Sequence, residues 1–476
     1  MKTRNLAWLA LPMMLLLSGC PSDGGGGVGE GSAAAIVYRA DQTIDTVPEL
    51  FLASSGAKLN PALTLPTAVQ AFAITSDKSA VVYIADQTTP GVFELYRVNL
   101  TAPGASTKLN GALASGGDVQ SFKLIPDGSG VVYLADETTD SVNELYRVLF
   151  SNPTNSAKLN GSLITNGNVL DFDVTSNSAR VVYLADQDID TVVELYQNSL
   201  SSIGVPTKLH SSYAAGRSVT VFKLLLNSSG VLYAANQTTS TVVELYESVF
   251  GGTLGATVSH SLVIPGGNVL DFAVSPDSTS VVYRADQETD GVNELYRVAL
   301  TSLTNSAKLN GPLVVNGDVD THYVVTPDSA SVVYVADQTV DGQLELYRTV
   351  FSGLANTRLL NGLITGSEAV FDVVTIPDSS GVVYIADQDS AGTRELYRMS
   401  FSAPGATTKL NPILASGRRV DSVLVTSDSA SVVYQANQTS APAVELYRVF
   451  FSSAGTSTTL NGTLVSGGNV EAFAVR

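Results

Sequence analysis

The sequence has very few of the residues on which most catalytic and metal centres depend. Its 476 residues include one cysteine, Cys20, one tryptophan, Trp8, and three histidines. A single cysteine cannot form a disulfide within the chain, so no such bond stabilises the fold. The pattern Gly-x-Ser-x-Gly, which presents the serine nucleophile in many hydrolases, does not occur. Nucleophilic catalysis therefore has little support from the sequence.

Basic residues are scarce relative to acidic ones. The chain has 26 Lys and Arg against 44 Asp and Glu, which gives a formal net charge of −18 at pH 7. A surface of this sign repels phosphate backbones, so we exclude nucleic acid as a partner, and it does not favour anionic lipid headgroups either. The acidic residues are spread along the chain and not grouped, which indicates a solvated surface.

Long hydrophobic runs occur only at the N-terminus, where residues 1–19 have the anatomy of a signal peptide. Two basic residues precede the apolar segment 6–17, and the sequence Leu-Ser-Gly-Cys follows and ends at Cys20. This sequence resembles the lipobox of bacterial lipoproteins, which implies that Cys20 is lipidated and becomes the first mature residue. Pro21 stands where that family often has an aspartate for inner-membrane retention, so the resemblance favours the outer membrane. An ordinary secretory signal with a chance cysteine is the alternative.

The chain divides into three parts on this basis. Residues 1–19 form the signal peptide, residues 20–34 hold the lipidated cysteine and a Gly-rich tether, and residues 35–476 form one domain. The glycines predict a flexible tether that holds the domain away from the bilayer. We expect a monomer in a bacterial cell envelope, with the lipid as its only membrane contact and the domain in the periplasm or at the cell surface.

A repeat with a period of about 50 residues fills the domain, and such a period indicates a solenoid, a propeller or an array. Each copy contains Val-Val-Tyr or a close variant, then Ala-Asp-Gln or a close variant, then a polar loop and Glu-Leu-Tyr or Glu-Leu-Phe. The tyrosine of the first motif falls at Tyr38, Tyr83, Tyr133, Tyr183, Tyr233, Tyr283, Tyr334, Tyr384 and Tyr434.

Each copy has the pattern of four short strands and no helical periodicity, which matches a propeller blade. Such a blade is stable only when neighbouring blades cover both of its faces. Within one copy we predict strands at residues 121–124, 131–135 and 144–150, a loop at 152–156 and a fourth strand from Lys158.

The two ends of the repeat region complement each other. The region begins at Tyr38 with a second strand that lacks a first, and it ends at residues 472–475 with a first strand that lacks a second. The C-terminal strand can therefore complete the N-terminal blade and close a ring. We predict an all-β propeller of nine four-stranded antiparallel blades; eight blades with one irregular copy is the alternative, because the first copy is shorter.

The turns that precede the Val-Val-Tyr strands carry a family resemblance. Those at residues 275–278, 326–329 and 376–379 contain Pro-Asp-Ser and resemble the Ser-Pro-Asp-Gly repeat of TolB-type, WD40-like propellers. The resemblance implies the propeller fold over nearly all of the domain. The α/β domain of TolB and the hydrolase domain of prolyl oligopeptidase relatives have no counterpart in the sequence, so we expect neither of their activities.

The repeated acidic residues indicate structure and not a site. An Asp or Asn follows the Ala of the first motif in every copy, and a residue present in every blade cannot mark one active site. We predict that this side chain caps backbone N–H groups of its loop. A weak calcium site is predicted at Asp186, Asp188 and Asp190, where carboxylates alternate, although Thr191 stands where an EF-hand has glycine. Beyond this we expect no cofactor.

The three histidines do not suggest a shared metal site. His210 and His260 occupy one slot in adjacent copies, where asparagine stands elsewhere, and blades that fan apart keep such residues from sharing an ion. His322 lies alone beside a first strand, close to the central channel of the predicted ring.

Local function is expected where the repeat breaks. His210, Tyr213 and Arg217 depart from the pattern in one loop, and Arg418 and Arg419 depart from it in the corresponding loop of a later copy. Tyrosine and arginine are common anchors of protein interfaces, so we predict that these five residues bind an envelope protein partner. Drift of surface loops is the alternative explanation.

We therefore expect a non-catalytic, lipid-anchored scaffold that binds a partner protein. The sequence leaves two alternative functions open. One is an envelope lyase or hydrolase with a metal in the central channel, and the other is a surface structural or adhesive protein.

Overall fold

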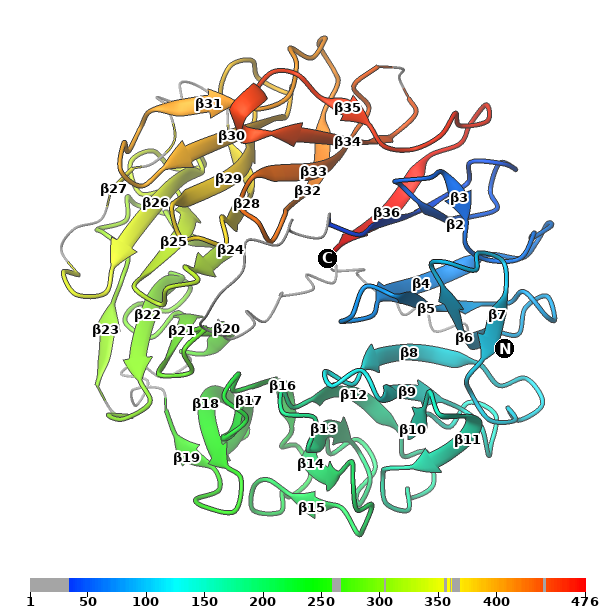
Figure 1. The fold of residues 1–476 in the computed structure, drawn as a ribbon. Coiled ribbons are helices and arrows are strands. Elements are labelled where there is room, and N and C mark those ends of the chain that lie inside the picture. The colour runs from blue at the N-terminus through cyan, green and yellow to red at the C-terminus, as the bar shows by residue number, and fades with distance from the viewer. Residues whose placement is uncertain are drawn as a thin grey trace, which may run out of the picture.

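The computed structural model describes residues 34–258, 267–303, 305–354, 358–359, 361, 369–439 and 442–476. Its strands form nine antiparallel sheets of four strands each, arranged as a closed ring (Figure 1). The predicted β-propeller is confirmed, and the number of blades is nine. The described residues contain one short 3₁₀ helix, η1 (Phe451–Ser453), and no helix among them is long and apolar enough to span a bilayer.

The blades are numbered along the chain: blade 1 consists of β36, β1, β2 and β3, blade 2 of β4–β7, and so on to blade 9, β32–β35. The inner strands, nearest the centre of the ring, are β4 (Val69–Ile74), β8 (Val119–Leu124), β12 (Val169–Val174), β16 (Val219–Leu224), β20 (Val269–Val274), β24 (Val319–Val325), β28 (Val370–Thr375), β32 (Val420–Val425) and β36 (Val470–Val475). The second strands are β1 (Ile36–Ala40), β5 (Ala80–Ala85), β9 (Gly130–Ala135), β13 (Arg180–Ala185), β17 (Gly230–Thr239), β21 (Ser280–Ala285), β25 (Ser331–Ala336), β29 (Gly381–Ala386) and β33 (Ser431–Ala436).

The third strands are β2 (Glu49–Leu52), β6 (Glu94–Asn99), β10 (Glu144–Leu149), β14 (Glu194–Ser199), β18 (Val242–Val249), β22 (Glu294–Ala299), β26 (Glu345–Val350), β30 (Glu395–Ser400) and β34 (Glu445–Phe450). The outer strands are short: β3 (Ala57–Lys58), β7 (Ser106–Lys108), β11 (Asn152–Lys158), β15 (Thr207–Lys208), β19 (Ala256–Thr257), β23 (Ser306–Lys308), β27 (Arg358–Leu359), β31 (Thr407–Lys409) and β35 (Thr458–Thr459).

The ring is closed by pairing between the two ends of the domain, as predicted. β36 lies antiparallel to β1, with Val37 opposite Ala474 and Tyr38 opposite Phe473. The backbone N–H of Ala35 donates to the carbonyl oxygen of Arg476 at 2.8 Å, so the pairing continues to the last residue. A complete four-stranded blade results from segments at opposite ends of the sequence.

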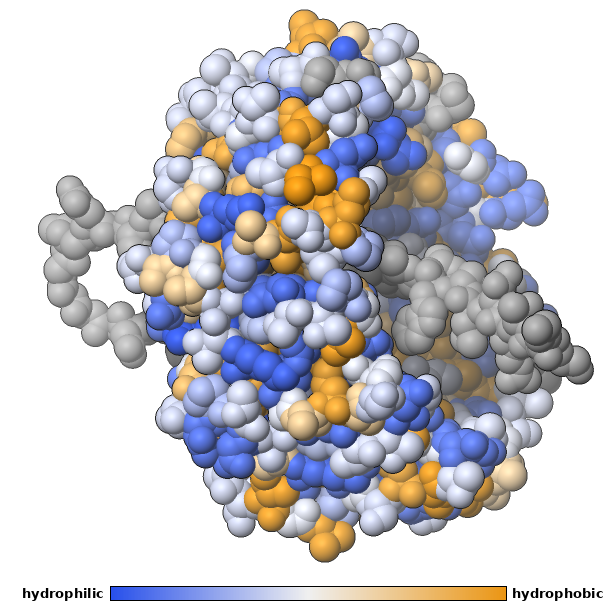
Figure 2. Space-filling view, turned by 90° about the vertical axis from the view of Figure 1, so that its right-hand side faces the viewer, coloured by the Kyte–Doolittle hydropathy of each residue, from blue (hydrophilic) through white to orange (hydrophobic). Residues whose placement is uncertain are grey.

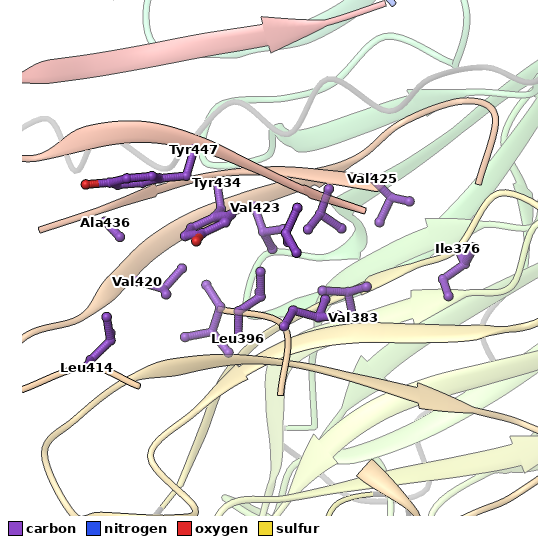
Figure 3. Packing of buried hydrophobic residues seen from close by; sticks show 14 residues of the cluster. Ile376, Val383, Leu396, Leu414, Val420, Val423, Val425, Tyr434, Ala436 and Tyr447 are labelled. Carbon is purple, nitrogen blue, oxygen red and sulfur yellow. The ribbon is translucent and has the colours of Figure 1, made fainter. Parts of the chain in front are cut away.

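The core consists of clusters between neighbouring blades, which explains why consecutive strand residues are apolar. In Figure 3, Val383 and Leu396 of blade 8 pack with Val420 and Tyr434 of blade 9. The Val-Val-Tyr strand is buried on both faces because each face meets another blade. Within each blade the motif tyrosine stacks on the aromatic ring of the third strand; the Tyr434 and Tyr447 centroids are 5.5 Å apart.

The ring has two loop-bearing faces, because connections in an antiparallel sheet alternate between its ends. The motif face carries the loops after Ala-Asp-Gln and the loops that lead from each outer strand to the next blade. The turn face carries the Pro-Asp-Ser turns and the loops between third and outer strands. On the outer side of the ring near β3 and β7, hydrophobic residues lie in separate small groups among hydrophilic ones (Figure 2).

Candidate functional site

The motif aspartate caps two loops of the motif face, as predicted. In blade 2, Asp86 Oδ1 accepts the backbone N–H of Ala68 at 2.7 Å and Oδ2 accepts that of Gly91 at 2.9 Å. The first bond ties the loop entering the blade, and the second ties the loop after the motif. Both carboxylate oxygens are therefore engaged in backbone hydrogen bonds.

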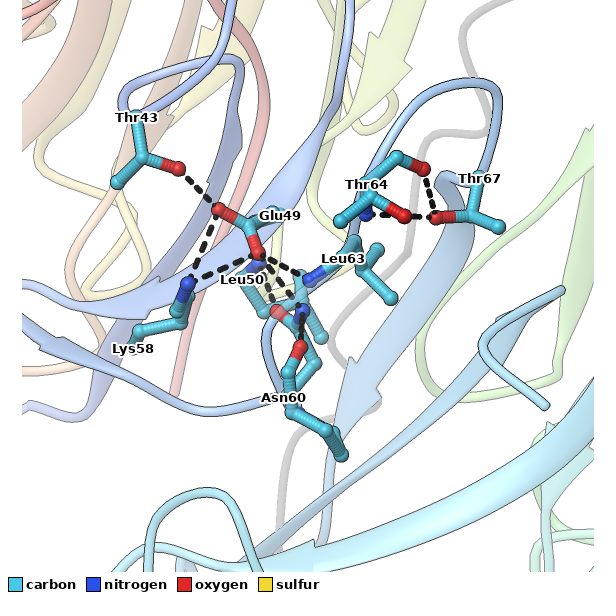
Figure 4. Close-up of polar contacts among 9 residues, drawn as sticks. Thr43, Glu49, Leu50, Lys58, Asn60, Leu63, Thr64 and Thr67 are labelled. Atoms are coloured by element: carbon cyan, nitrogen blue, oxygen red, sulfur yellow. Dashed lines mark hydrogen bonds and ion pairs between the residues drawn. The ribbon is translucent and has the colours of Figure 1, made fainter.

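The glutamate of Glu-Leu-Tyr is bound within its own blade. In blade 1, Glu49 is buried, and its oxygens accept hydrogen bonds from Lys58 Nζ at 3.1 Å, from the backbone N–H of Leu63 at 3.1 Å and from Thr43 (Figure 4). The lysine supplies the opposite charge that a buried carboxylate needs. This glutamate holds its outer strand and loop and is not free for chemistry.

The glutamine of Ala-Asp-Gln joins neighbouring blades. Gln42 Oε1 accepts the hydroxyl of Tyr38 at 2.8 Å and the backbone N–H of Gly462, from blade 9, at 3.0 Å. Gln187 makes the same contacts with Tyr183 and Gly161. The repeated polar side chains thus assemble the ring, which agrees with the structural role predicted for them.

Two of the predicted partner-binding residues are buried. His210 Nε2 accepts the backbone N–H of Leu195 at 2.9 Å, the same task that Asn110 Oδ1 performs for Leu95 at 2.8 Å. The Tyr213 ring stacks on His210 with centroids 4.0 Å apart. Burial lowers the pKa of His210. His210 and Tyr213 therefore fill the space between blades 4 and 5 and offer no exposed surface to a partner.

Arg217 and Arg418 have a structural role that the sequence did not reveal. They stand where blade 3 has Gly117, whose Cβ, if present, would lie 2.4 Å from the carbonyl oxygen of Asp136. In both blades with arginine in this slot, the motif aspartate is an asparagine, Asn236 or Asn437.

The two substitutions compensate for each other. Asn236 Nδ2 donates to the carbonyl oxygens of Gly216 and Ser240, and the Arg217 guanidinium donates to that of Thr238 at 3.1 Å. In blade 9, Arg418 Nη1 donates to the carbonyl oxygen of Asn437 at 2.8 Å. Oδ1 of each asparagine still accepts the backbone N–H before the inner strand, from Ser218 or Arg419, but in blade 5 the loop after the motif presents carbonyl groups to donors where the aspartate blades present an N–H to Oδ2.

The two predicted loops share the motif face but lie far apart. The loop with Arg217 joins β15 to β16, and the loop with Arg418 joins β31 to β32, nearly across the ring (Figure 1). One partner surface made of all five residues is therefore not formed. Arg419 is the most exposed of them, with 51% of its side chain accessible.

The predicted calcium ligands are engaged elsewhere or separate. Asp186 Oδ1 accepts the backbone N–H of Asn168 at 2.6 Å, and Asp188 pairs with Lys208 Nζ at 2.9 Å. Within the described ranges, no group of three or more His, Cys, Asp and Glu side chains could hold a metal ion. The alternative of a metal-dependent enzyme gains no donor set from this part of the chain.

Charged side chains of blades 6 to 8 lie along the inner strands. Asp271 on β20 accepts hydrogen bonds from Arg284 Nη2 and from the Tyr323 hydroxyl of the next blade, both at 2.7 Å. His322 on β24 bonds Asp320, and this hydrogen bond raises the pKa of His322. Burial raises the pKa of Asp372 on β28. The Tyr323–Asp271 bond joins blades 6 and 7, and the position of His322 on the inner strand β24 places it near the centre of the ring, as predicted.

A second arginine pair at the junction of blades 8 and 9 was missed by the sequence reasoning. Arg394, just before β30, pairs with Arg419 through an isolated parallel backbone bridge. The Arg394 guanidinium lies 3.8 Å from the ring centroid of Phe371 on β28. The signal was available: the slot of Arg394 holds an uncharged residue in every other copy.

The signal peptide of residues 1–19 and the lipidation site Cys20 lie outside the described residues, as does all of the tether except Ala34. Their assignment stays a prediction from the sequence.

Comparisons with known proteins support the fold. No protein-family model matches the chain, and no curated protein is significantly similar to it. A solved structure of a eukaryotic initiation factor is similar over 90% of this chain and 98% of its own, with a TM-score of 0.55 and 11% identity. Dipeptidyl peptidase 4 of Porphyromonas gingivalis is similar over 72% of this chain and 53% of its own, with a TM-score of 0.52 and 12% identity. Similarity at these identities concerns the fold alone.

Proposed function

We propose that this protein is a lipid-anchored propeller of the bacterial cell envelope that binds a partner protein on its motif face and catalyses no reaction. The lipobox-like sequence ending at Cys20 supports the anchor, and Pro21 favours the outer membrane. The Pro-Asp-Ser turns favour membership of the TolB-type, WD40-like propellers. The net charge of −18 argues against nucleic acid as the partner.

Large apolar side chains exposed on the motif face carry this proposal. Val315 is 85% exposed and Ile413 is 88% exposed, in loops that lead into blades 7 and 9. Other copies have Ser, Thr or Ala in most of the same slots, so the repeat does not need these side chains. Exposed apolar residues beside polar ones are the composition of a protein contact surface.

Val315 also borders a hollow in the surface. The hollow has a volume of about 790 Å³ and is open to solvent, and Asp290, Lys308 and Pro312 contribute to its wall. Asn316 Nδ2 donates to Asp341 at 3.3 Å, which joins the Val315 loop to the loop after β25, where Val340 is also exposed. Blades 6 and 7 thus offer an apolar contact with a polar rim, an arrangement that suits a protein partner.

Capture of partners from envelope extracts tests the proposal. We compare the wild-type protein with a Val315→Ser/Ile413→Ser variant by pull-down and mass spectrometry. Val205→Ser is the matched control, because Val205 is 90% exposed but lies on the turn face, between β14 and β15. We expect one or more proteins to be recovered by the wild type and the control and to fall several-fold with the double variant.

Two results would contradict the proposal. The wild type could recover no partner above background, or the double variant and the control could recover the same proteins in equal amounts. The second result would remove the motif face as the binding surface.

A further inference from the structure

The junction of blades 8 and 9 breaks a rule that most other junctions follow. In six junctions, the side chain of the residue just before the inner strand accepts a hydrogen bond. The donor is the backbone N–H of the residue just before the third strand of the preceding blade in the ring. Asp118 accepts that of Phe93 at 2.7 Å, and Asn469 accepts that of Val444 at 2.9 Å. The other acceptors are Asn168, Ser218, Asn268 and Asp318.

Loss of this bond does not require arginine. In two other junctions the acceptor slot holds Ala68 or Ala369, whose side chain cannot accept a hydrogen bond. At the junction of blades 8 and 9 the two facing slots hold Arg394 and Arg419. Like charges on adjacent backbone segments repel, and among the described residues only Arg419 has a carboxylate, that of Asp421, to offset this repulsion. The hydrogen bonding between blades therefore does not account for the two arginines.

Arg394 is held in place without being neutralised. Its guanidinium stacks on Phe371, and among the described residues no carboxylate lies within 4.0 Å of it. Stacking restrains the plane of the guanidinium, and the residue as a whole remains exposed to solvent. Arg419 pairs with Asp421 but remains half exposed, and Arg418 is tied through one nitrogen to Asn437. Arg394 and Arg419 thus lie on paired backbone segments, and Arg418 directly precedes Arg419, on a molecule with a net charge of −18.

We propose that Arg394, Arg418 and Arg419, here called the arginine site, bind carboxylates of an acidic segment of the partner protein. This inference rests on the proposed function and adds the chemistry of the partner. Guanidinium groups pair with carboxylates through two parallel N–H···O bonds, and a guanidinium already held by stacking loses less entropy on binding.

We expect the acidic segment of the partner to carry an apolar residue next to its acidic residues. Ile413 lies in the same loop as Arg418 and Arg419 and is almost fully exposed, so it offers an apolar contact beside the charged one. An anionic membrane is a poorer occupant, because the net charge of −18 would repel it over the rest of the surface. Repulsion of the same kind would confine an acidic segment to this junction and so fix its position.

Direct binding tests the inference with purified full-length protein. The probe is a short fluorescein-labelled peptide of glutamates with one leucine, and the readout is fluorescence anisotropy at low and physiological salt. We expect binding that weakens as salt rises, and an affinity about tenfold or more lower for Arg394→Gln/Arg419→Gln, as expected for lost charge-assisted hydrogen bonds. The same peptide with glutamine for glutamate should not bind.

A control variant tests whether loss of a positive charge elsewhere on the surface weakens binding. Lys78→Gln removes one positive charge from the turn between β4 and β5, on the opposite face, and should leave the affinity unchanged. Thermal unfolding of each variant establishes that the ring is intact.

Four results would overturn the inference: no binding by the wild type, equal binding by the double variant, equal binding of the glutamine peptide, or binding of phosphatidylglycerol vesicles in place of the peptide. If partners are captured from extracts but do not depend on Arg394 and Arg419, the proposed function stands and the arginine site fails. If the peptide binds at the arginine site but extracts yield no partner, the proposed function fails instead.

Discussion

At the scale of single residues, glutamate has two opposite effects on the stability of this ring. Burial alone would raise the pKa of Glu144, but hydrogen bonds from Lys158, Thr138 and Tyr146 outweigh burial and lower it. Glu247 directly follows Glu-Leu-Tyr on β18, in the slot that holds arginine in most blades. It has no ion-pair partner among the described residues, and burial raises its pKa.

Replacing Glu247 should stabilise the protein at neutral pH. Its folded pKa is raised, so the folded state binds the proton more tightly than the unfolded chain, and ionisation at pH 7 weakens the fold. Glu247→Gln removes this cost, and we expect Tm to rise by about 1–2 °C at pH 7. The gain should vanish below the unfolded pKa of about 4.3. Calorimetry at pH 7 and in acid measures both.

Glu144→Gln is the matched variant with the opposite sign. The lowered pKa of Glu144 contributes stability that is fully present above the unfolded pKa and is lost as pH falls through the folded value. Replacement of Glu144 by Gln should therefore lower Tm at pH 7 and change Tm less in acid. A fall in Tm for Glu247→Gln at pH 7 would show that Glu247 makes a favourable contact as the carboxylate.

At the scale of elements, the turns between inner and second strands hold neighbouring blades together on the turn face. Ser329 has φ of +57°, and its hydroxyl accepts the backbone N–H of Asp277, from the preceding blade, at 3.0 Å. The same bond recurs across consecutive blades. The acceptors are Ser178, Ser228, Ser278, Ser329, Ser379 and Ser429. Gly128 stands in the equivalent position of blade 3 and has no hydroxyl to offer.

Ser329→Ala should destabilise the ring by about 1–2 kcal/mol, the value of a lost hydrogen bond whose donor stays partly unsatisfied. Ser329→Gly should cost less, because glycine adopts a positive φ without strain. Urea denaturation compares both with Ser302→Ala, whose exposed side chain makes no hydrogen bond within the described residues. Equal stability of all three variants would mean that the turns do not couple the blades.

The strands of the example repeat show how much of the fold the sequence predicts. The inner, second and third strands of the example repeat lie where the pattern placed them, because most of their apolar residues are buried, and those of β9 are buried on both faces. The fourth was misplaced: β11 runs over Asn152–Lys158, so the predicted loop at 152–156 is strand and the predicted strand from Lys158 is its end. Pro153 suggested a loop, but an outer strand has a free edge on which proline is tolerated.

The candidate site was predictable only in part. Arg418 and Arg419 were recognisable as departures from the repeat, but His210 and Tyr213 departed from it for packing reasons that only the neighbouring blade reveals. Arg394 escaped notice because its partner Arg419 is 25 residues later along the chain, in the next blade. A single sequence shows which slots change, whereas contacts between blades decide whether a change fills a gap or faces solvent.

At the scale of the whole molecule, stability is shared between neighbours around the ring. Each apolar cluster lies between adjacent blades, and the last one joins Val433 and Leu446 of blade 9 to Tyr38 and Phe51 of blade 1. Stability in such a repeat array is approximately a sum of terms within blades and between neighbours. Closure adds a final term, because β36 supplies both a strand of blade 1 and buried residues of this last cluster.

Removing β36 should therefore cost more than removing an equal length of surface loop. Deletion of residues 467–476 removes Val470 and Val475, exposes the edge of β1 and uncovers neighbours such as Tyr38 and Val433, and we expect a loss of about 5 kcal/mol or more from several buried apolar side chains. The unpaired edge should also promote aggregation. Thermal unfolding and light scattering measure these effects. Deletion of residues 1–33 is the control and should leave Tm unchanged, and addition of a synthetic peptide of residues 467–476 should restore the cooperative transition. If the truncated protein unfolds at the wild-type temperature, the ring does not depend on closure by β36, and nearest-neighbour contacts within the remaining blades suffice.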